Sequence, residues 1–329
     1  MSVTSQRIIK GDCTAGLRTL SDASVHCCVT SPPYWGLRDY GHDGQIGLEA
    51  TPEAYVARMV EVFREVRRVL RDDGTCWLNL GDSYAANAAT SKKVGESHRG
   101  SDTPTLNQPH QCRASVRGGE WSIKAKDLVG IPWRVAFALQ ADGWWLRQDI
   151  IWHKPNPMPE SVRDRCTKAH EYVFLLTKSE RYFYDADAVS EAVVCVRGPG
   201  NKKPLKGVAE DADKHRTRAG LHKAAERWRE DGPPESRNRR SVWTVTTKPY
   251  SGAHFAVMPP DIVEPCIKAG CPEGGTVLDP FAGSGTTLAV AAELGRNAIG
   301  CELNPSYIEL AEQRIKDARK SVSLFEGVS

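Results

Sequence analysis

The sequence predicts an α/β protein built on a doubly wound, mostly parallel sheet of seven strands. Over most of the chain, apolar runs of strand length alternate with segments of helical periodicity. A glycine-rich turn directly follows one of the last apolar runs, and turns of this kind join a strand to a helix at ligand sites. Between residues 190 and 241 the alternation stops, which predicts an insertion into the sheet domain.

The N-terminal region is predicted to be a β-α-β unit. Residues 7–12 and 25–30 form its strands, and residues 15–20 form the helix between them. The second strand runs directly into Ser31-Pro32-Pro33-Tyr34. Two adjacent prolines continue neither a strand ladder nor a helix, so they fix a rigid turn. That turn lies at the C-terminal end of a strand, where open α/β sheets bind their ligands.

A long helix and a third strand follow. Thr51 is a favourable N-cap, Pro52 suits the first helical position, and apolar residues then recur at helical spacing. Gly74 ends this helix, and residues 75–80 form the next strand. From about residue 84 to 120 the sequence is rich in Ser, Thr, Asn and Gly and lacks an apolar period. We expect this segment to be a mobile loop.

The remaining elements complete the sheet. Helices are predicted at residues 132–141, 260–269, 288–295 and 304–318, strands at residues 145–152, 277–279 and 297–301, and a hairpin at residues 171–184. With the hairpin counted as one element, seven strands result, and two of them come last in the chain. If these two C-terminal strands are counted as the first two, the strand series becomes that of an ordinary nucleotide-binding sheet. The chain is then permuted, with its ends between the second and third strands of that sheet.

The glycine-rich turn indicates a nucleoside ligand. Gly283 and Gly285 let the backbone approach a ligand closely, and the following helix presents unpaired N–H groups. The third glycine of a dinucleotide motif would fall at Leu288, and no lysine of a P-loop is present. The next strand ends in Glu302, where a carboxylate binds ribose hydroxyls. We therefore expect a nucleoside without a pyrophosphate.

Two motifs carry a resemblance to a known family. Residues 279–287, Asp-Pro-Phe-Ala-Gly-Ser-Gly-Thr-Thr, resemble the cofactor motif of the amino-methylating DNA methyltransferases, which use S-adenosylmethionine. Ser31-Pro32-Pro33-Tyr34 resembles the catalytic motif of the same family in its serine form, and here it precedes the cofactor motif. The resemblance implies a Rossmann-like methyltransferase fold of the permuted type, with S-adenosylmethionine as cofactor.

The resemblance also implies roles for individual residues. Asp12 would accept a hydrogen bond from the adenine amino group, Glu302 would hold the ribose, and Phe281 would line the methionine end. Residues 251–259 resemble an additional cofactor motif, in which His254 either contacts the ligand or only packs. The complete predicted cofactor set is Asp12, Thr30, His254, Phe255, Asp279, Pro280, Phe281, Ala282, Gly283, Ser284, Gly285, Thr286 and Glu302.

The catalytic motif suits methylation of an exocyclic amine. The lone pair of such an amine is delocalised into the base, and hydrogen-bond acceptors can draw the nitrogen toward tetrahedral geometry. Ser31 Oγ and the Pro32 carbonyl are the expected acceptors. Pro33 makes the turn rigid, and Tyr34 offers a flat face for an extruded base. The donor is already activated, so alignment is the main requirement.

Serine at position 31 favours cytosine N4 as the target, because family members with aspartate there mostly modify adenine N6. Adenine N6 is the alternative. Cytosine C5 chemistry is disfavoured, because it needs a nucleophilic cysteine in a Pro-Cys turn, and Pro265-Cys266 falls inside a predicted helix. Two other classes are a non-catalytic nucleic-acid binder with a retained cofactor fold, and a methyltransferase of RNA or protein amides.

The inserted segment is basic. Residues 196–241 contain 13 Lys and Arg against 7 Asp and Glu, although the whole chain has a formal net charge of only +3. We expect this segment to bind double-stranded DNA. The candidate contacts are Lys202, Lys203, Arg237, Arg239 and Arg240. A solvated polar linker is the alternative interpretation. The predicted parts are therefore a catalytic part at residues 1–189, a target-recognition region at 190–241 and a cofactor-binding part at 242–329.

Composition bounds the remaining partners. The ten cysteines include no C-x-x-C pair, so buried free thiols in a reducing compartment are expected and no metal site. No signal peptide and no apolar run of membrane-spanning length is present, which favours a cytoplasmic protein without a membrane partner. A restriction endonuclease counterpart and a homodimer are further partners compatible with such an enzyme.

Overall fold

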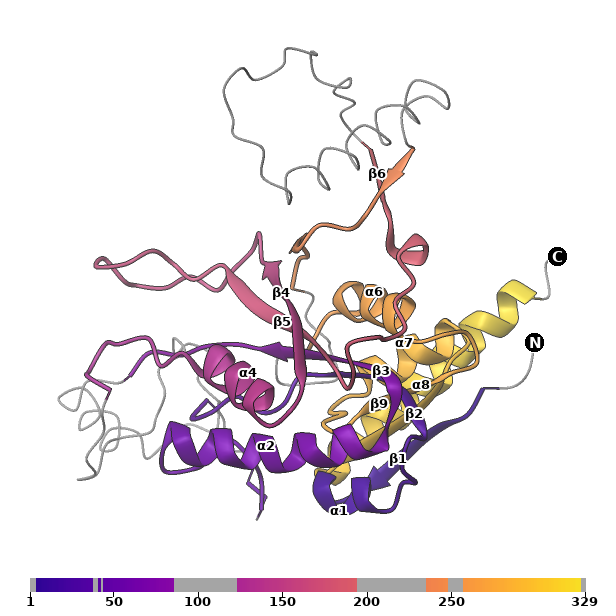
Figure 1. The fold of residues 1–329 in the computed structure, drawn as a ribbon, viewed down its shortest axis with the longest axis horizontal. Coiled ribbons are helices and arrows are strands. Elements are labelled where there is room, and N and C mark those ends of the chain that lie inside the picture. Colours follow the sequence, from indigo (N-terminus) through magenta and orange to yellow (C-terminus); the bar gives the residue numbers. More distant parts are fainter. Residues whose placement is uncertain are drawn as a thin grey trace, which may run out of the picture. The chain divides into compact units, whose positions relative to one another are not determined.

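The computed structural model describes residues 4–37, 41–42, 44–85, 123–193, 235–247 and 257–326. The chain divides into two compact units (Figure 1). The first comprises Met1–Asp185 and Ser241–Ser329, and the second comprises Ala186–Arg240. The predicted loop at residues 84–120 lies almost entirely outside the described residues.

The first unit is built on one large sheet. Among the described residues it has eight strands, in the spatial order β1 (Gln6–Lys10), β10 (Asn297–Glu302), β9 (Thr276–Asp279), β2 (Val25–Thr30), β3 (Leu70–Leu80), β5 (His170–Thr177), β4 (Trp145–His153) and β8 (Val242–Thr244). β5 is antiparallel to both neighbours, and every other pair is parallel. The C-terminal strands β9 and β10 thus lie between β1 and β2, as the predicted permutation requires.

Two details of the predicted sheet are wrong. The sheet has eight strands where we predicted seven, because the short strand β8 pairs with β4 at the edge. Residues 171–184 are not a hairpin: β5 pairs with β3 and β4, and residues 181–184 form no strand. The amide of Phe183 donates to the Asp73 carbonyl, and the amide of Asp185 donates to the Ala269 carbonyl. Partners elsewhere in the fold therefore replace the expected strand pairing.

Helices cover both faces of the sheet (Figure 1). One face is covered by α1 (Cys13–Arg18), α2 (Pro52–Val69) and α4 (Ile131–Ala141), and the other by α6 (Pro260–Gly270), α7 (Thr286–Glu293) and α8 (Pro305–Glu326). Thr51 caps α2 by accepting a hydrogen bond from the Ala54 amide at 3.1 Å, as predicted. The helix ends at Val69, earlier than predicted, because Leu70 already pairs with β2 as the first residue of β3.

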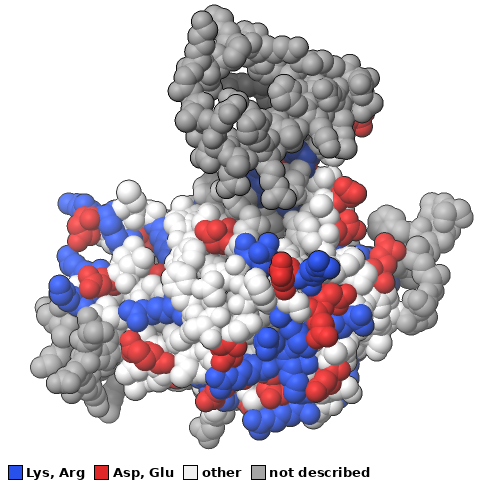
Figure 2. All heavy atoms as spheres, in the orientation of Figure 1, with Lys and Arg blue, Asp and Glu red and all other residues white. Residues whose placement is uncertain are grey.

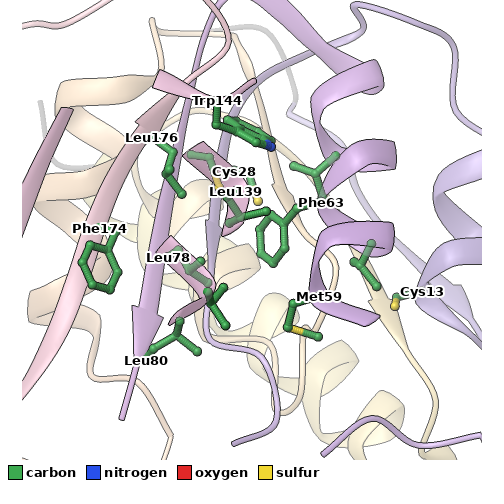
Figure 3. Close-up of a cluster of buried hydrophobic side chains, with 14 of the residues drawn as sticks. Cys13, Cys28, Met59, Phe63, Leu78, Leu80, Leu139, Trp144, Phe174 and Leu176 are labelled. Carbon is green, nitrogen blue, oxygen red and sulfur yellow. The ribbon is translucent and has the colours of Figure 1, made fainter. Parts of the chain in front are cut away.

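The largest core cluster lies between the sheet and the α1, α2 and α4 face. Figure 3 shows that its side chains come from helices and strands alike, including Met59 and Phe63 of α2, Leu139 of α4, and Leu78 and Leu80 of β3. Each of these five side chains is completely buried. Burying large apolar side chains stabilises the fold by about 1.5–3 kcal/mol each. The cluster therefore fixes α2 and α4 against the sheet beside its ligand-binding edge.

The second unit is small within the described residues. It contains the 3₁₀ helix η1 (Asp187–Val189) and an antiparallel pair, β6 (Glu191–Ala192) with β7 (Ser236–Arg237).

No described helix of the chain has both the length and the apolar character needed to cross a membrane. Eight described cysteines are free thiols, and all of them except Cys166 are buried.

Candidate active site

The two motifs meet at one edge of the sheet. Ser31 follows β2 and Pro280 follows β9, and these strands are parallel neighbours in which Cys28 lies opposite Leu278. The C-terminal ends of β1, β10, β3 and β4 lie at the same edge, together with the N-terminal end of the antiparallel strand β5. The edge therefore brings together side chains from six or more strands, as open α/β sheets do at their ligand sites.

A buried hydrogen bond ties the two motifs together. Thr30 Oγ1 donates to Asp279 Oδ1 at 2.6 Å, and the amide of Phe281 donates to the same oxygen at 3.1 Å. Asp279 is only 4% exposed. Burial raises the pKa of its carboxyl from 3.8 to about 6, although hydrogen bonds from Thr30 and Thr287 oppose the shift. Thr30 and Asp279 thus hold the two loops in register.

The two glycines of the turn have different roles. Gly283 has φ +51°, and a Cβ atom there would meet nothing nearer than the Phe281 carbonyl oxygen at 4.0 Å. Gly285 has φ +78°, and a Cβ atom there would lie 2.7 Å from Ala311 Cβ on α8. The open space that we expected at both glycines is present at Gly283. At Gly285 the missing side chain instead permits close packing of α8.

Most other side chains of the turn face inward. Pro280, Ala282, Ser284 and Thr286 are buried. Arg314 of α8 donates to Ser284 Oγ at 3.3 Å and to Thr286 Oγ1 at 2.7 Å. Partial exposure is limited to Phe281 and Gly283.

The carboxylates of Glu302, at the end of β10, and Asp12, after β1, accept hydrogen bonds from backbone amides. Glu302 accepts the Gly283 amide through Oε2 and the Asn304 amide through Oε1, both at 2.8 Å. Burial raises the pKa of Glu302 although these amides oppose the shift. Asp12 caps α1 by accepting the Ala15 amide at 2.8 Å, and its other oxygen lies 3.6 Å from Arg58 Nη2. Both predicted cofactor carboxylates therefore stand at the same edge as Gly283.

The catalytic motif is held by side chains that the sequence did not single out. Ser31 Oγ and Tyr34 Oη each lie 3.2 Å from Asn79 Oδ1. Tyr34 also donates to Glu171 Oε2 at 2.7 Å. The Tyr55 hydroxyl donates to the Pro33 carbonyl at 2.9 Å, which fixes the turn itself. The only sequence signal for this support was a polar residue near each of two strand ends, in β3 and in β5.

Glu171 is an ionised carboxylate inside this network. Burial alone would raise its pKa, but the Lys154 ammonium and the hydrogen bonds from Tyr34 and Asn79 outweigh burial and lower the pKa. Lys154 donates to Oε1, and its ammonium also lies 4.3 Å from the centre of the Trp152 ring. Burial and the Glu171 charge together raise the pKa of the Tyr34 hydroxyl. Tyr34 is therefore a neutral hydrogen-bond donor.

The ring of Tyr34 lies directly against Gly81. A Cβ atom at position 81 would lie 2.5 Å from Tyr34 Cε2, so only glycine fits there. Just beyond it, Asp82 Oδ1 accepts hydrogen bonds from the amides of Gly130 and Ile131 at 3.0 and 3.1 Å. The loop after β3 and the start of α4 are thereby fixed beside the catalytic motif.

Several predicted residues belong to the second unit or lie outside the described residues. His254, Phe255, Lys202 and Lys203 are not among the described residues. Arg237, Arg239 and Arg240 belong to the second unit, where Arg240 and Arg237 approach Glu191 Oε2 at 2.9 and 3.5 Å. One carboxylate thus partly neutralises two of the predicted DNA contacts. Within the described ranges, no three His, Cys, Asp or Glu side chains form a metal site.

The surface of the first unit carries mixed charge. Figure 2 shows Lys and Arg side chains gathered over the α1 and α2 side, with Asp and Glu among them. Arg58, Arg64 and Arg68 each form ion pairs with carboxylates, for example Arg58 with Glu61 at 2.8 Å. These ion pairs offset the positive charge of the arginines. The charge of this surface therefore does not by itself indicate a DNA-binding site.

The chain is similar to known DNA methyltransferases over nearly its whole length. It is 45% identical over 315 residues to the type II methyltransferase M.XycI of Xanthomonas campestris pv. cyanopsidis, covering 96% of this chain and 89% of that one. The solved PvuII DNA methyltransferase, named as cytosine-N4-specific, has a TM-score of 0.59 and 16% identity, with 98% of this chain and 93% of that chain covered. A putative DNA modification methylase of Thermus thermophilus, solved with S-adenosyl-L-methionine, has a TM-score of 0.54 and 23% identity, with 96% of each chain covered.

The family assignment rests on the sequence matches. The family model described as DNA methylase, for N6- and N4-specific enzymes, matches residues 25–313. This range includes both motifs and every strand of the sheet except β1. Together with the 45% identity to M.XycI, the match establishes that this chain is a DNA methyltransferase of the N6/N4 DNA methylase family.

Proposed function

We propose that this DNA methyltransferase is site-specific and transfers a methyl group to the exocyclic N4 of a cytosine turned out of duplex DNA. The observation that carries the proposal is the position of Ser31 and Gly283. They follow the adjacent strands β2 and β9, so a base at one and a methyl donor at the other would be neighbours. Alignment of this kind contributes about 7–11 kcal/mol to lowering a barrier in favourable systems.

S-adenosylmethionine is the methyl donor that the site fits. When bound, it supplies a methyl group on a positively charged sulfonium. Gly283 leaves open space where a side chain would stand, and Phe281 beside it is partly exposed. Burial raises the pKa of both Asp279 and Glu302, and the groups that oppose it, including His42 near Glu302, do not reverse either shift. A positively charged ligand suits such a site. Asp12 and Glu302 would hold the nucleoside part.

The residues of the catalytic motif act on the amine. Ser31 Oγ and the Pro32 carbonyl would accept its hydrogen bonds and localise its lone pair on nitrogen. The Tyr34 ring, held through its hydroxyl, would stack on the extruded base. No strong base is required, because the nitrogen becomes acidic once it is methylated.

Cytosine N4 is favoured over adenine N6 by the serine at position 31. The PvuII enzyme, whose name gives cytosine N4 as its target, has the same fold. To test the target, duplex DNA is methylated with labelled S-adenosylmethionine, digested to nucleosides and analysed by mass spectrometry. N4-methyl-2′-deoxycytidine is the expected product. N6-methyl-2′-deoxyadenosine would establish the alternative.

The biological setting follows from the type II relatives. A type II methyltransferase such as M.XycI suggests a restriction–modification role here, with a restriction endonuclease as counterpart, in the cytoplasm. We further propose that residues 190–241 recognise the target sequence and that residues 1–189 and 242–329 provide catalysis and cofactor binding. A homodimer is compatible with this assignment, and sedimentation at several concentrations tests it.

A further inference from the structure

Glu171 organises a partly buried hydrogen-bond network beside the catalytic motif. It stands at the N-terminal end of β5, which reaches the active edge because β5 is antiparallel to β3 and β4. Its Oε2 atom accepts from Tyr34 Oη at 2.7 Å and from Asn79 Nδ2 at 3.2 Å. Its Oε1 atom accepts from Lys154. The two oxygens thus have different partners, a cation for Oε1 and the motif with Asn79 for Oε2.

The direction of each hydrogen bond is determined by the groups available. Asn79 Nδ2 has two acceptors, Glu171 Oε2 and the Tyr172 carbonyl at 3.1 Å, so Asn79 Oδ1 must face Ser31. Tyr34 has a single proton, and the carboxylate at 2.7 Å is a stronger acceptor than an amide oxygen at 3.2 Å. The Tyr34 oxygen and Asn79 Oδ1 can therefore only accept a hydrogen bond from Ser31.

This arrangement leaves Ser31 one choice. Its hydroxyl lies 3.2 Å from Asn79 Oδ1, which can only accept. The single proton of Ser31 is therefore directed inward. The lone pairs of Oγ remain directed away from the network, where they can accept from an amine.

We propose that Glu171, paired with Lys154, is a positioning residue that makes Ser31 a hydrogen-bond acceptor for the target amine. The inference rests on the proposed function only in that Ser31 receives the amine. It holds equally for cytosine N4 and adenine N6, since both are NH₂ donors. Lys154 orients the carboxylate, and Asn79 and Tyr34 transmit its orientation to Ser31.

Glutamine at position 171 gives a sharp test, because it has one acceptor oxygen and one donor NH₂. Lys154 offers only donors, so it takes the oxygen and turns the NH₂ toward Tyr34 and Asn79. Tyr34 must then turn its proton toward Asn79 Oδ1, which lies 3.2 Å away, or toward Ser31 Oγ, and either choice disturbs the inward hydrogen bond of Ser31. We expect Glu171→Gln to lower kcat by about 100-fold. The Kd for S-adenosylmethionine should not change, because the cofactor loops contact other side chains.

A second substitution should restore activity. In Lys154→Met/Glu171→Gln the oxygen of the introduced amide is no longer drawn to an ammonium, so it can again accept from Tyr34 and Asn79. We expect kcat of the double variant to exceed that of Glu171→Gln by about tenfold. A carboxylate with only a structural role would make the double variant the worse of the two. Glu65→Gln is the matched control, because Glu65 is a half-buried carboxylate paired with Arg68 on α2.

Lys154→Met alone tests the inference if Glu171→Gln fails to fold in a thermal melt. Without the ammonium, burial raises the pKa of Glu171, so the acid limb of the kcat–pH profile should move to higher pH. An unchanged limb would overturn the inference, as would full kcat in Glu171→Gln or a double variant no faster than the single one. Nucleoside analysis of the same digests separates the two proposals: methylated adenine with the expected kcat pattern refutes only the cytosine target.

Discussion

The two halves of the active edge shift the pKa values of their carboxylates in opposite directions. On the cofactor side, Asp279 and Glu302 accept hydrogen bonds from loop amides, and burial raises the pKa of each. On the catalytic side, Glu171 is mostly buried, but Lys154 and its hydrogen-bond donors lower its pKa. Proximity to a protein cation accounts for the difference. The carboxylate of the catalytic half is therefore ionised in advance, whereas the pKa values of Asp279 and Glu302 are raised, and a sulfonium ligand would oppose both shifts.

The largest expected effect is on the catalytic half. In Tyr34→Ala, the stacking face and the donor to Glu171 are both lost, so kcat should fall by about 100-fold or more. The Kd for S-adenosylmethionine, measured by calorimetry, should remain within about twofold, since the cofactor half has its own hydrogen bonds. A parallel loss of cofactor affinity would contradict the division into two halves. Tyr34→Phe keeps the ring and should lose less activity.

The pH dependence of stability should distinguish the cofactor half. Burial raises the pKa of Asp279 from 3.8 to about 6, so between these pH values the folded state binds more protons than the unfolded state. The stability that the protonated Asp279 carboxyl contributes to the folded state is fully present below pH 3.8 and is lost as pH rises through 6. Relative to the parent, Asp279→Asn should gain stability between about pH 4 and pH 7, on the order of 3 kcal/mol from a shift of about two units.

Urea unfolding at a series of pH values measures this difference. Saturating S-adenosylmethionine should reduce it, because a nearby positive charge favours the ionised form of Asp279. A difference between Asp279→Asn and the parent that does not change with pH would show that the carboxyl is not destabilised by burial.

The two glycines of the cofactor turn should separate stability from binding. Both have left-handed backbones, so alanine costs about 1–2 kcal/mol at either position. Gly285→Ala also forces Cβ to within 2.7 Å of Ala311 Cβ, and such overpacking adds about 1–3 kcal/mol. Gly283→Ala has no such clash and should instead weaken cofactor binding. Urea midpoints and calorimetric Kd values check both variants, and equal stability loss would argue against the assigned packing role.

Substitutions in the second unit should have the smallest effect on the two halves of the active edge. Substituting Arg237, Arg239 and Arg240 by alanine should leave kcat at saturating DNA and the cofactor Kd unchanged. Because Glu191 pairs with two of them, the slope of log affinity against log salt should decrease by only about one to two.

A variant with the same charge change provides the control for this experiment. Arg18, Arg64 and Arg71 are exposed residues of the first unit, on its mixed-charge α1 and α2 side and at the start of β3. Replacing them by alanine should not alter the salt slope. If this control and the triple variant of the second unit behave alike, the second unit is not the DNA surface.

The sequence predicted the fold better than it predicted the support of the site. Proline and glycine restrict or free the backbone locally, so the turns after residues 30 and 279 could be identified directly. The order of β9 and β10 in the sheet followed from those turns. The eighth strand could not be identified in this way, since β8 is only three residues long and forms through pairing with β4. The hairpin prediction failed because Phe183 and Asp185 found partners far away in the chain.

The sequence by itself determined which residues stand at the ends of β2 and β9, because local backbone chemistry places Ser31 and Gly283 there. Only the tertiary structure decided what surrounds them. Asn79, Lys154 and Glu171 come from three separate strands or their ends, and the antiparallel direction of β5 brings Glu171 to the active edge. Hydrogen bonds between residues so far apart in the chain depend on strand order and direction, which no local pattern encodes. The same reason explains why the sequence did not reveal the close packing of α8 against Gly285.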